Sequence, residues 1–173
     1  MHTFTFANAV EQGLRRAPSV ELLRGVFDAA ASVHLDRFLN VPAAKLPAPE
    51  NGDPAALLAE LSHLFDSREQ VDAAAQLVSS YVGSGGNSNR LAQALIVCLL
   101  REDRDFHTIQ CVEAAVRQHE LLRGTGDERL PLIAAARYLA AHAATNRSQR
   151  QTFEIARRLH RGDRLYEDLP PAA

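Results

Sequence analysis

The sequence contains only two cysteines, Cys98 and Cys111, among its 173 residues. Both lie in apolar stretches with helical spacing, and they form no pattern typical of a disulfide-stabilised domain. Long hydrophobic runs are also missing, and the first ten residues lack the basic start and the apolar stretch of a signal peptide. These absences argue against a secreted or membrane-spanning protein and predict a cytoplasmic location.

An excess of charge of either sign is absent, because 19 Lys and Arg face 21 Asp and Glu and give a net charge of −2. Such a chain has no strong field to attract nucleic acid or a lipid surface, so we predict neither partner. Residues 147–164 are the exception, with six arginines, two acids and a charge of +4. We expect these arginines to form the solvated face of a terminal helix whose inner stripe contains Phe153, Ile155, Ala156 and Leu159.

Alternation of apolar and polar residues, which is typical of a half-buried strand, is missing as well. Apolar residues instead recur at helical spacing through nearly the whole chain. The pattern predicts an all-α protein, a compact single-domain bundle of about eight helices over residues 1–173, with a fragment of a longer chain as the alternative. The expected helices span residues 3–16, 19–39, 54–66, 68–82, 88–101, 104–122, 129–144 and 147–161.

Several residues mark where these helices begin and end. Ser19 is expected to cap the second helix, Asp53 the third, and Asn87 or Ser88 the fifth. The prolines of residues 41–53 disfavour both helix and central strand, so this stretch is predicted to be a surface crossover. For the second helix we predict an inner stripe formed by Leu22, Leu23, Val26, Phe27 and Ala30.

The sequence also lacks the short motifs of common enzyme classes. It has no Gly-x-Ser-x-Gly turn, which removes the simplest hydrolase hypothesis. The glycine-rich stretch GSGGNSNR has no strand before it and no Gly-Lys-Ser/Thr after it, so it does not match a phosphate-binding loop. We interpret it as a turn between two helices.

The helix expected over residues 104–122 combines apolar residues on several sides with polar ones, which predicts a central position in the bundle. His107 and Glu113 lie about 120° apart on the helical wheel, so the two cannot chelate one ion from this helix alone. His107 and Cys111 have the i, i+4 spacing of a metal-ligand pair. The alternative is that Cys111 is a small core residue and that His107 makes a polar contact between helices.

Histidines on other predicted helices are expected to supply partners for this central helix. His34 continues an apolar stripe, His142 ends an alanine-rich helix with Tyr138 one turn earlier, and His2 precedes the first helix. Convergence of such residues would form a pocket in which His107, Glu113 and His142 are candidate catalytic groups. The candidate metal ligands are His2, His107, Glu113 and His142, with non-haem iron as a suitable metal. The alternative for each histidine is a structural hydrogen bond.

Five segments together resemble the helical region of bacterial proteins that contain a Rieske-type 2Fe-2S domain: HTFTFANA, LDRFLNVPAAKLP, LLREDRDFHTIQCVEAAVRQ, LIAAARYLAAHAAT and RRLHRGDRLYED. The resemblance implies an oxidoreductase association and a Rieske-type ferredoxin as partner, and its matching positions are His2, His107, Glu113 and His142. A Rieske cluster requires Cys-x-His and Cys-x-x-His, whereas Cys98 is followed by LLR and Cys111 by VEA. This chain therefore cannot hold that cluster by itself.

Two functions follow from these patterns. The first is a helical oxidoreductase-associated domain with a histidine-lined metal or substrate pocket, which takes a small-molecule substrate and works with the ferredoxin. The second is a non-catalytic helical module for protein interaction or dimerisation, in which the polar residues of the central helix only fix its packing. A homo-oligomer is compatible with both functions.

Overall fold

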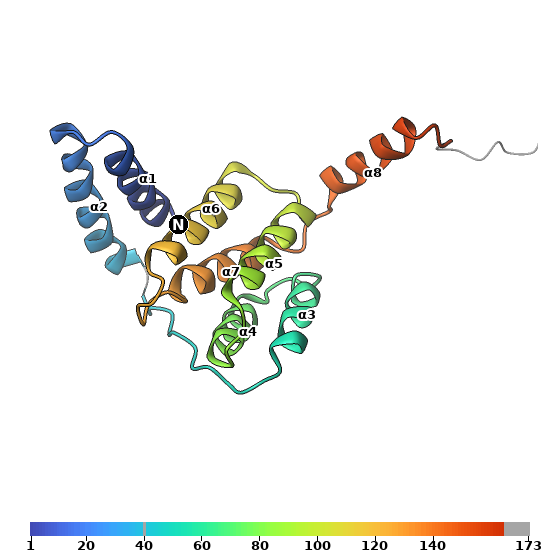
Figure 1. Ribbon diagram of the computed structural model, residues 1–173, viewed down its shortest axis with the longest axis horizontal. Helices are drawn as coiled ribbons and strands as arrows, with labels where there is room; N and C mark the ends of the chain where they lie inside the picture. The colour runs from blue at the N-terminus through green and yellow to red at the C-terminus, as the bar shows by residue number, and fades with distance from the viewer. Residues whose placement is uncertain (40, 165–173) are drawn as a thin grey trace, which may run out of the picture.

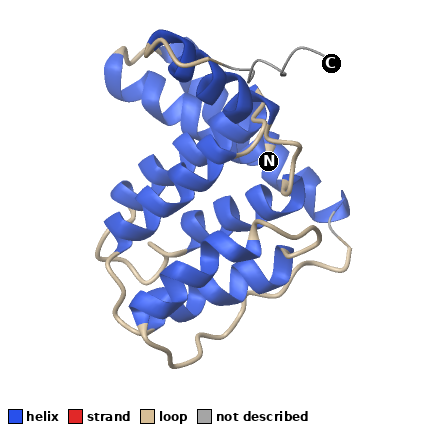
Figure 2. Cartoon of the chain, turned by 90° about the vertical axis from the view of Figure 1, so that its right-hand side faces the viewer, coloured by secondary structure: helices blue, strands red, loops and turns tan. Residues whose placement is uncertain are grey.

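The computed structural model describes residues 1–39 and 41–164, and this part of the chain is all-α, with eight helices and no strand (Figure 1). Loops alone connect the helices (Figure 2). The predicted helix order is confirmed, and each helix begins and ends within a few residues of its predicted range. The helices are α1 (His2–Arg16), α2 (Val20–Leu39), α3 (Pro54–Leu64), α4 (Val71–Gly83), α5 (Ser88–Arg101), α6 (Phe106–Leu121), α7 (Leu130–His142) and α8 (Ser148–His160). The end of the last resembling segment, beyond residue 164, lies outside the described residues.

The predicted caps account for several helix starts. The side chain of Asp53 accepts hydrogen bonds from the backbone N–H groups of Ala55 and Ala56, and that of Asn87 accepts one from Arg90. Ser19 accepts a bond from the backbone N–H of Leu22. Each bond satisfies a donor that the first turn of a helix leaves without an intrahelical partner.

The core lies among α3 to α7, where α4 packs on α7 and α7 packs on α6. Alanines on the facing sides of α4 and α7 are buried, which lets the two backbones approach closely. Around them pack large side chains with almost no exposed surface, and each contributes roughly 1.5–3 kcal/mol by leaving water. They include Leu61, Phe65, Val78, Tyr81, Leu91, Leu95 and Leu132.

The predicted crossover of residues 41–53 runs along the outside of α4. Gln76 donates a hydrogen bond to the carbonyl of Ala48, and Ser79 donates one to that of Pro47. The Oγ of Ser80 accepts a bond from the backbone N–H of Glu50. The polar stripe of α4 therefore satisfies the backbone of a segment that has no secondary structure of its own.

The inner stripe predicted for α2 is wrong at most of its positions. Phe27 is 76% exposed and Leu23 is 50% exposed, whereas Ala29 is the buried residue of this helix. The reason is that α2 packs mainly against α1, in a hairpin that lies beside the core (Figure 1). At Gly25 a Cβ would lie only 2.9 Å from a methyl group of Val10, and Leu22 lies against Gly13 of α1, so α2 faces α1 with Leu22 and Gly25 rather than with Phe27.

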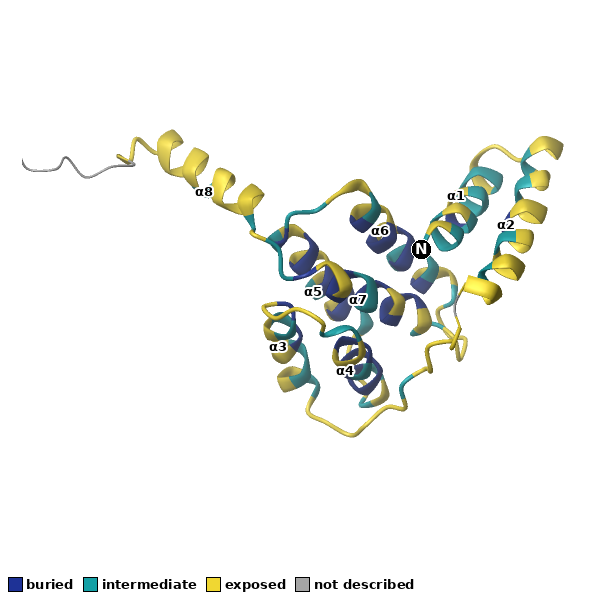
Figure 3. Ribbon diagram, turned by 180° about the vertical axis from the view of Figure 1, so that it is seen from behind, coloured by how far each residue is buried: buried dark blue, intermediate teal, exposed yellow. Residues whose placement is uncertain are grey.

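The inner stripe predicted for α8 is also wrong. Phe153, Ile155 and Leu159 are 63%, 46% and 54% exposed. Among the described residues, α8 has no more than marginal contact with any other helix, and it extends away from the bundle at the side opposite the α1–α2 hairpin (Figure 1). Buried residues gather on α4 to α7, while α8 is exposed along nearly its whole length (Figure 3).

A buried carboxylate holds the segment between α7 and α8 against the core. Glu102, which is 8% exposed, accepts hydrogen bonds from the backbone N–H and the hydroxyl of Thr145 and from the guanidinium of Arg147. Arg147 also reaches Asp66 at 2.6 Å, and Arg101 pairs with both acids. The cluster ties the ends of α3 and α5 to the start of α8.

Candidate functional site

Helix α6 occupies the predicted central position, since it packs against α1, α5 and α7. A capping box starts it: Asp105 accepts a hydrogen bond from the N–H of Thr108, and the Thr108 hydroxyl accepts one from the N–H of Asp105. One face buries Cys111 and Ala115 in the core. Its polar face lies against α1 and is only partly enclosed.

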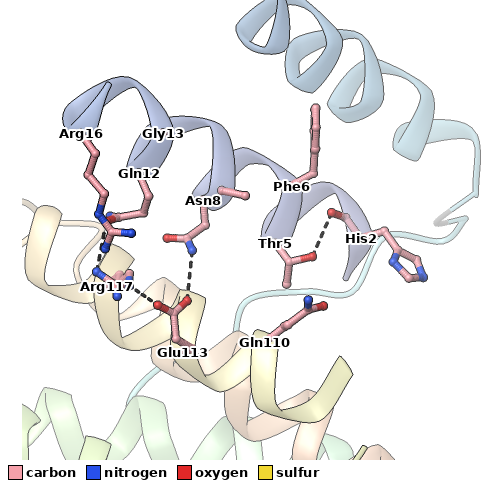
Figure 4. Close-up of a pocket in the computed structure, with 11 residues that line it drawn as sticks. His2, Thr5, Phe6, Asn8, Gln12, Gly13, Arg16, Gln110, Glu113 and Arg117 are labelled. Atoms are coloured by element: carbon pink, nitrogen blue, oxygen red, sulfur yellow. Dashed lines mark hydrogen bonds and ion pairs between the residues drawn. The ribbon is translucent and has the colours of Figure 1, made fainter. Parts of the chain in front are cut away.

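Glu113 is the central group of the polar contact between α1 and α6. It accepts a hydrogen bond from the buried Asn8 and forms an ion pair with Arg117, one turn along α6. Arg117 donates to Gln12, and Gln118 donates to Asn8, so both helices are cross-linked (Figure 4). Because both oxygens of Glu113 are engaged, its contacts favour a positioning role over the predicted catalytic or metal-binding role.

A groove of about 620 Å³ runs between α1 and α6, lined by His2, Thr5, Phe6, Asn8, Ala9, Gln12, Gly13, Arg16, Gln110, Glu113 and Arg117. His2 lies at one end of α1 and Arg16 at the other, with Glu113 turned toward Asn8 rather than toward His2 (Figure 4). Among the described residues, Arg16 makes no ion pair, so its positive charge is available to a ligand. Both walls offer hydrogen-bonding groups, and Phe6, Ala9 and Gly13 add apolar surface on the α1 side.

His2 and His107 meet at the end of this groove. Their ring centroids are 4.9 Å apart in an edge-to-face arrangement, and the ring of Phe106 lies 3.8 Å from that of His107. The Nδ1 atom of His107 is buried and has no hydrogen-bond partner. Two of the four predicted ligand positions are thus brought into contact, and one of them has an unsatisfied nitrogen.

His142 lies near the same end of α6 but makes a separate contact. Its Nδ1 is 2.8 Å from the carbonyl of Tyr138, and the two rings are 4.4 Å apart. The N–H of Thr108 lowers the pKa of Asp105 most strongly, burial opposes this, and the nearby rings of His107 and His142 lower it further. Asp105 is therefore within electrostatic range of both histidines, while its carboxylate is hydrogen-bonded to Thr108.

These positions do not provide a resident metal centre. Across residues 1–39 and 41–164, no three His, Cys, Asp or Glu side chains are placed to hold one metal ion. A non-haem iron site needs such a set, commonly two histidines and a carboxylate on one side of the metal. The residues as placed therefore do not fit iron. They form instead a histidine pair, His2 and His107, with His142 and Asp105 nearby, and we call these four the histidine cluster.

The two cysteines are buried free thiols. Burial raises the pKa of Cys111 from its ordinary 9.0 to about 11, and it also raises the pKa of Cys98. The prediction that Cys111 is a small core residue is confirmed by its burial against α7. At neutral pH neither thiol is a ready nucleophile.

We expect the folded protein to react with Ellman's reagent at least about 100-fold more slowly than the urea-unfolded chain, because the thiolate fraction falls roughly tenfold for each unit rise in pKa. Stopped-flow absorbance in native buffer and in urea measures both rates. Two thiols that react at the unfolded rate in native buffer would contradict the burial of Cys98 and Cys111.

The remaining histidines differ from their predicted places. His34, expected to point inward, is exposed on α2 with its ring 5.9 Å from that of Phe38. His119, whose polar surroundings did not predict burial, is 2% exposed and its Nδ1 lies 2.8 Å from the carbonyl of Glu128. Its spacing from the buried Thr108, Val112 and Ala115 places it on the core face of α6, and this periodicity was the signal that identifies it.

Comparisons with known proteins return no relative: no family model, no curated protein and no solved structure matches the chain. The resemblance to Rieske-associated helical regions therefore stays a prediction. In the part of the chain that the structure describes, every helix is too short or too polar to cross a lipid bilayer.

Proposed function

We propose that this protein is a helical oxidoreductase-associated domain that binds a small organic acid in the α1–α6 groove, beside the histidine cluster. The observation that carries the proposal is the contact of His2 with His107, whose buried Nδ1 lacks a partner. A buried imidazole nitrogen without a hydrogen bond is costly unless a ligand or water completes it. The free guanidinium of Arg16 supports an anionic end for the ligand.

Different residues of the groove bind different parts of the ligand. The carboxylate of the ligand pairs with Arg16, while Gln110 and Thr5 hydrogen-bond its polar groups. Glu113 and Asn8 keep the two helices at a fixed separation. At the other end His2 lines the groove and contacts His107, and the two rings supply imidazole nitrogens for a polar group of the ligand. A Rieske-type ferredoxin as the electron partner is supported by the resemblance alone.

Benzoate is a suitable probe because it combines one carboxylate with a flat apolar ring. We expect benzoate to shift amide signals of α1 and α6 in NMR titrations of the full chain, and Arg16→Gln and His107→Ala each to weaken its binding at least about tenfold. His63→Ala is the matched control, since His63 is an exposed histidine on α3. Absence of shifts in α1 and α6 up to millimolar benzoate, or equal weakening by the control, contradicts the proposal.

Metal analysis provides a second test. Protein purified without chelators is expected to contain iron and zinc well below one ion per chain, because no three described ligands converge. One equivalent of iron that is lost in His107→Ala would show that the cluster rearranges into a metal centre. Titration with a purified Rieske-type ferredoxin, followed by NMR, tests the partner independently.

A second candidate function is the non-catalytic interaction or dimerisation module. The observation that favours it is the apolar surface that α8 presents to solvent, far from the groove (Figure 3). Large exposed apolar faces on otherwise polar helices are typical of protein contacts. The two functions do not exclude each other, because they use different parts of the molecule.

A further inference from the structure

Helix α8 is amphipathic, but among the described residues no other helix covers its apolar face. Phe153, Ala156 and Leu159 lie on one side, while Arg150, Arg157 and Arg158 lie on the other. All of these residues are exposed, and no described helix packs against them. An amphipathic helix of this length is marginal in water unless its apolar side is buried. The amphipathic sequence of α8 thus requires a covered apolar face, whereas the fold leaves that face exposed. Binding of this face to a surface of another molecule would cover it.

The position of α8 prevents it from covering its own bundle. Its first turn is held by Asp103, whose carboxylate accepts a hydrogen bond from the N–H of Gln149. Gln149 in turn donates to the carbonyl of Arg104, and Arg147 is fixed by Glu102 and Asp66. These contacts lie at the turn between α5 and α6 and direct α8 outward (Figure 1). The apolar face of α8 is thus turned away from the described part of its own bundle.

The same chain carries an apolar groove that could receive such a helix. It has a volume of about 360 Å³ and lies between α5 and α6, lined by Ile96, Leu99, Ile109, Val112, Glu113, Val116 and Arg117. Ile96 and Ile109 at its rim are 38% and 46% exposed. A groove between two helices with apolar walls is a common receptor for an amphipathic helix.

Charge favours a second copy of this chain as the occupant. Residues 147–164 carry +4, whereas residues 1–146 contain 13 Lys and Arg against 17 Asp and Glu and carry −4. Approach of the α8 segment of one copy to the bundle of another is therefore attractive, and like-charged contacts between two bundles or two α8 segments are avoided. An anionic membrane is a less favourable partner, because it would attract the basic α8 segment but repel the acidic bundle to which α8 is attached.

We propose that two copies of this chain exchange their α8 helices, each α8 inserting its apolar face into the α5–α6 groove of the other. Each copy gives one α8 and receives one, so a single twofold axis relates the two contacts and the dimer is closed. Phe153 and Leu159 are the anchors, and Ile109 lies at the rim of the receiving groove. The proposal names the partner for the interaction function, which it deepens, and does not depend on ligand binding at the histidine cluster.

Sedimentation equilibrium of the full chain tests the exchange. We expect the wild type to be a dimer at micromolar concentration, and Phe153→Asp and Ile109→Asp each to raise its dissociation constant at least about 30-fold. Phe27→Asp, a matched change of an exposed residue on α2, is expected to leave the dimer intact. Circular dichroism shows that each variant retains its helices.

Mixing the two defective variants gives the sharpest result. A Phe153→Asp chain still has an intact groove and an Ile109→Asp chain still has an intact α8, so an equimolar mixture regains one of the two contacts. We expect the mixture to associate at least about tenfold more tightly than either variant alone. If the mixture associates no more tightly than either variant alone, the proposed exchange of α8 helices is wrong.

Other results of the same measurements distinguish failure of the proposed α8 exchange from failure of the interaction function. A dimer that survives Phe153→Asp but is lost in Phe27→Asp overturns the exchange and assigns dimerisation to α2. A wild-type chain that stays monomeric at hundreds of micromolar overturns both. A monomer whose α8 binds vesicles of phosphatidylserine, with loss of binding in Phe153→Asp, assigns the helix to a lipid surface and overturns the exchange.

Discussion

Replacement of Glu102 by alanine is expected to destabilise the folded protein by about 3 kcal/mol, because it removes a buried carboxylate and leaves the partly buried Arg101 and Arg147 without this counter-ion. Glu102 is 8% exposed and binds Arg147, Arg101 and both donor groups of Thr145. Its removal also releases the segment from which α8 starts. Urea unfolding followed by circular dichroism measures the free energy, and a loss below about 1 kcal/mol would contradict a buried ion cluster.

Glu102→Gln is the matched variant, since it keeps the shape of the side chain but removes its charge. Burial raises the pKa of Glu102, but the N–H of Thr145 and the guanidinium of Arg147 lower it more, so its pKa lies below the ordinary carboxyl value. A carboxyl whose folded pKa is lowered stabilises the protein above its unfolded pKa, and this contribution is lost as pH falls through the folded pKa. Below about pH 5 the wild type should therefore approach Glu102→Gln in stability. If the difference in unfolding free energy between the wild type and Glu102→Gln stays constant down to the pH of acid unfolding, the ionised carboxylate of Glu102 is not the source of the stability.

Gly86→Ala is expected to destabilise the protein by about 1–3 kcal/mol through overpacking. A Cβ at this position would lie 2.6 Å from both Cδ1 and Cζ of Tyr81. Tyr81 is 2% exposed and its hydroxyl donates to the carbonyl of Asn87 at 3.1 Å, so the ring cannot move without losing core contacts and this bond. Thermal and urea unfolding measure the change.

Gly126→Ala is the control for Gly86→Ala. A Cβ at Gly126 meets no atom within 4 Å, and its φ lies outside the left-handed region. Alanine there reduces the freedom of the unfolded chain, so the variant should be unchanged or more stable by up to about 1 kcal/mol. Equal destabilisation by both substitutions would mean that the loss of glycine, not the contact with Tyr81, is the cause.

The sequence predicted the helices well because the signals that begin and end them are local. Asp53 and Asn87 cap the helices that they were expected to cap, and the glycine-rich turn separates α4 from α5. The central position of α6 also followed from its periodicity, since apolar residues on several sides require several neighbours. The candidate site was anticipated in part: His2 and His107 meet, but Glu113 is engaged by Arg117 and His142 makes its own contact.

The periodicity of apolar residues does not predict which apolar helix face is covered by a neighbouring helix. The amphipathic pattern of α8 is at least as clear as those of the core helices, and α2 is rich in apolar residues, yet Phe153 and Phe27 face solvent. On α2 the small residues Gly25 and Ala29 let α1 approach closely, and this steric choice cannot be read from hydrophobicity. On α8 the contacts of Asp103 and Arg147, distant in sequence from each other, set its direction.

The amino-acid sequence alone determined the all-α class, the order of the helices and their ends, because each depends on groups within a few residues of one another. Only the tertiary structure decided which faces are buried, which histidines meet and where α8 points. These depend on close approach between helices and on ion pairs across more than 40 residues, such as that of Arg147 with Glu102. The histidine cluster and the uncovered face of α8 both result from the tertiary structure.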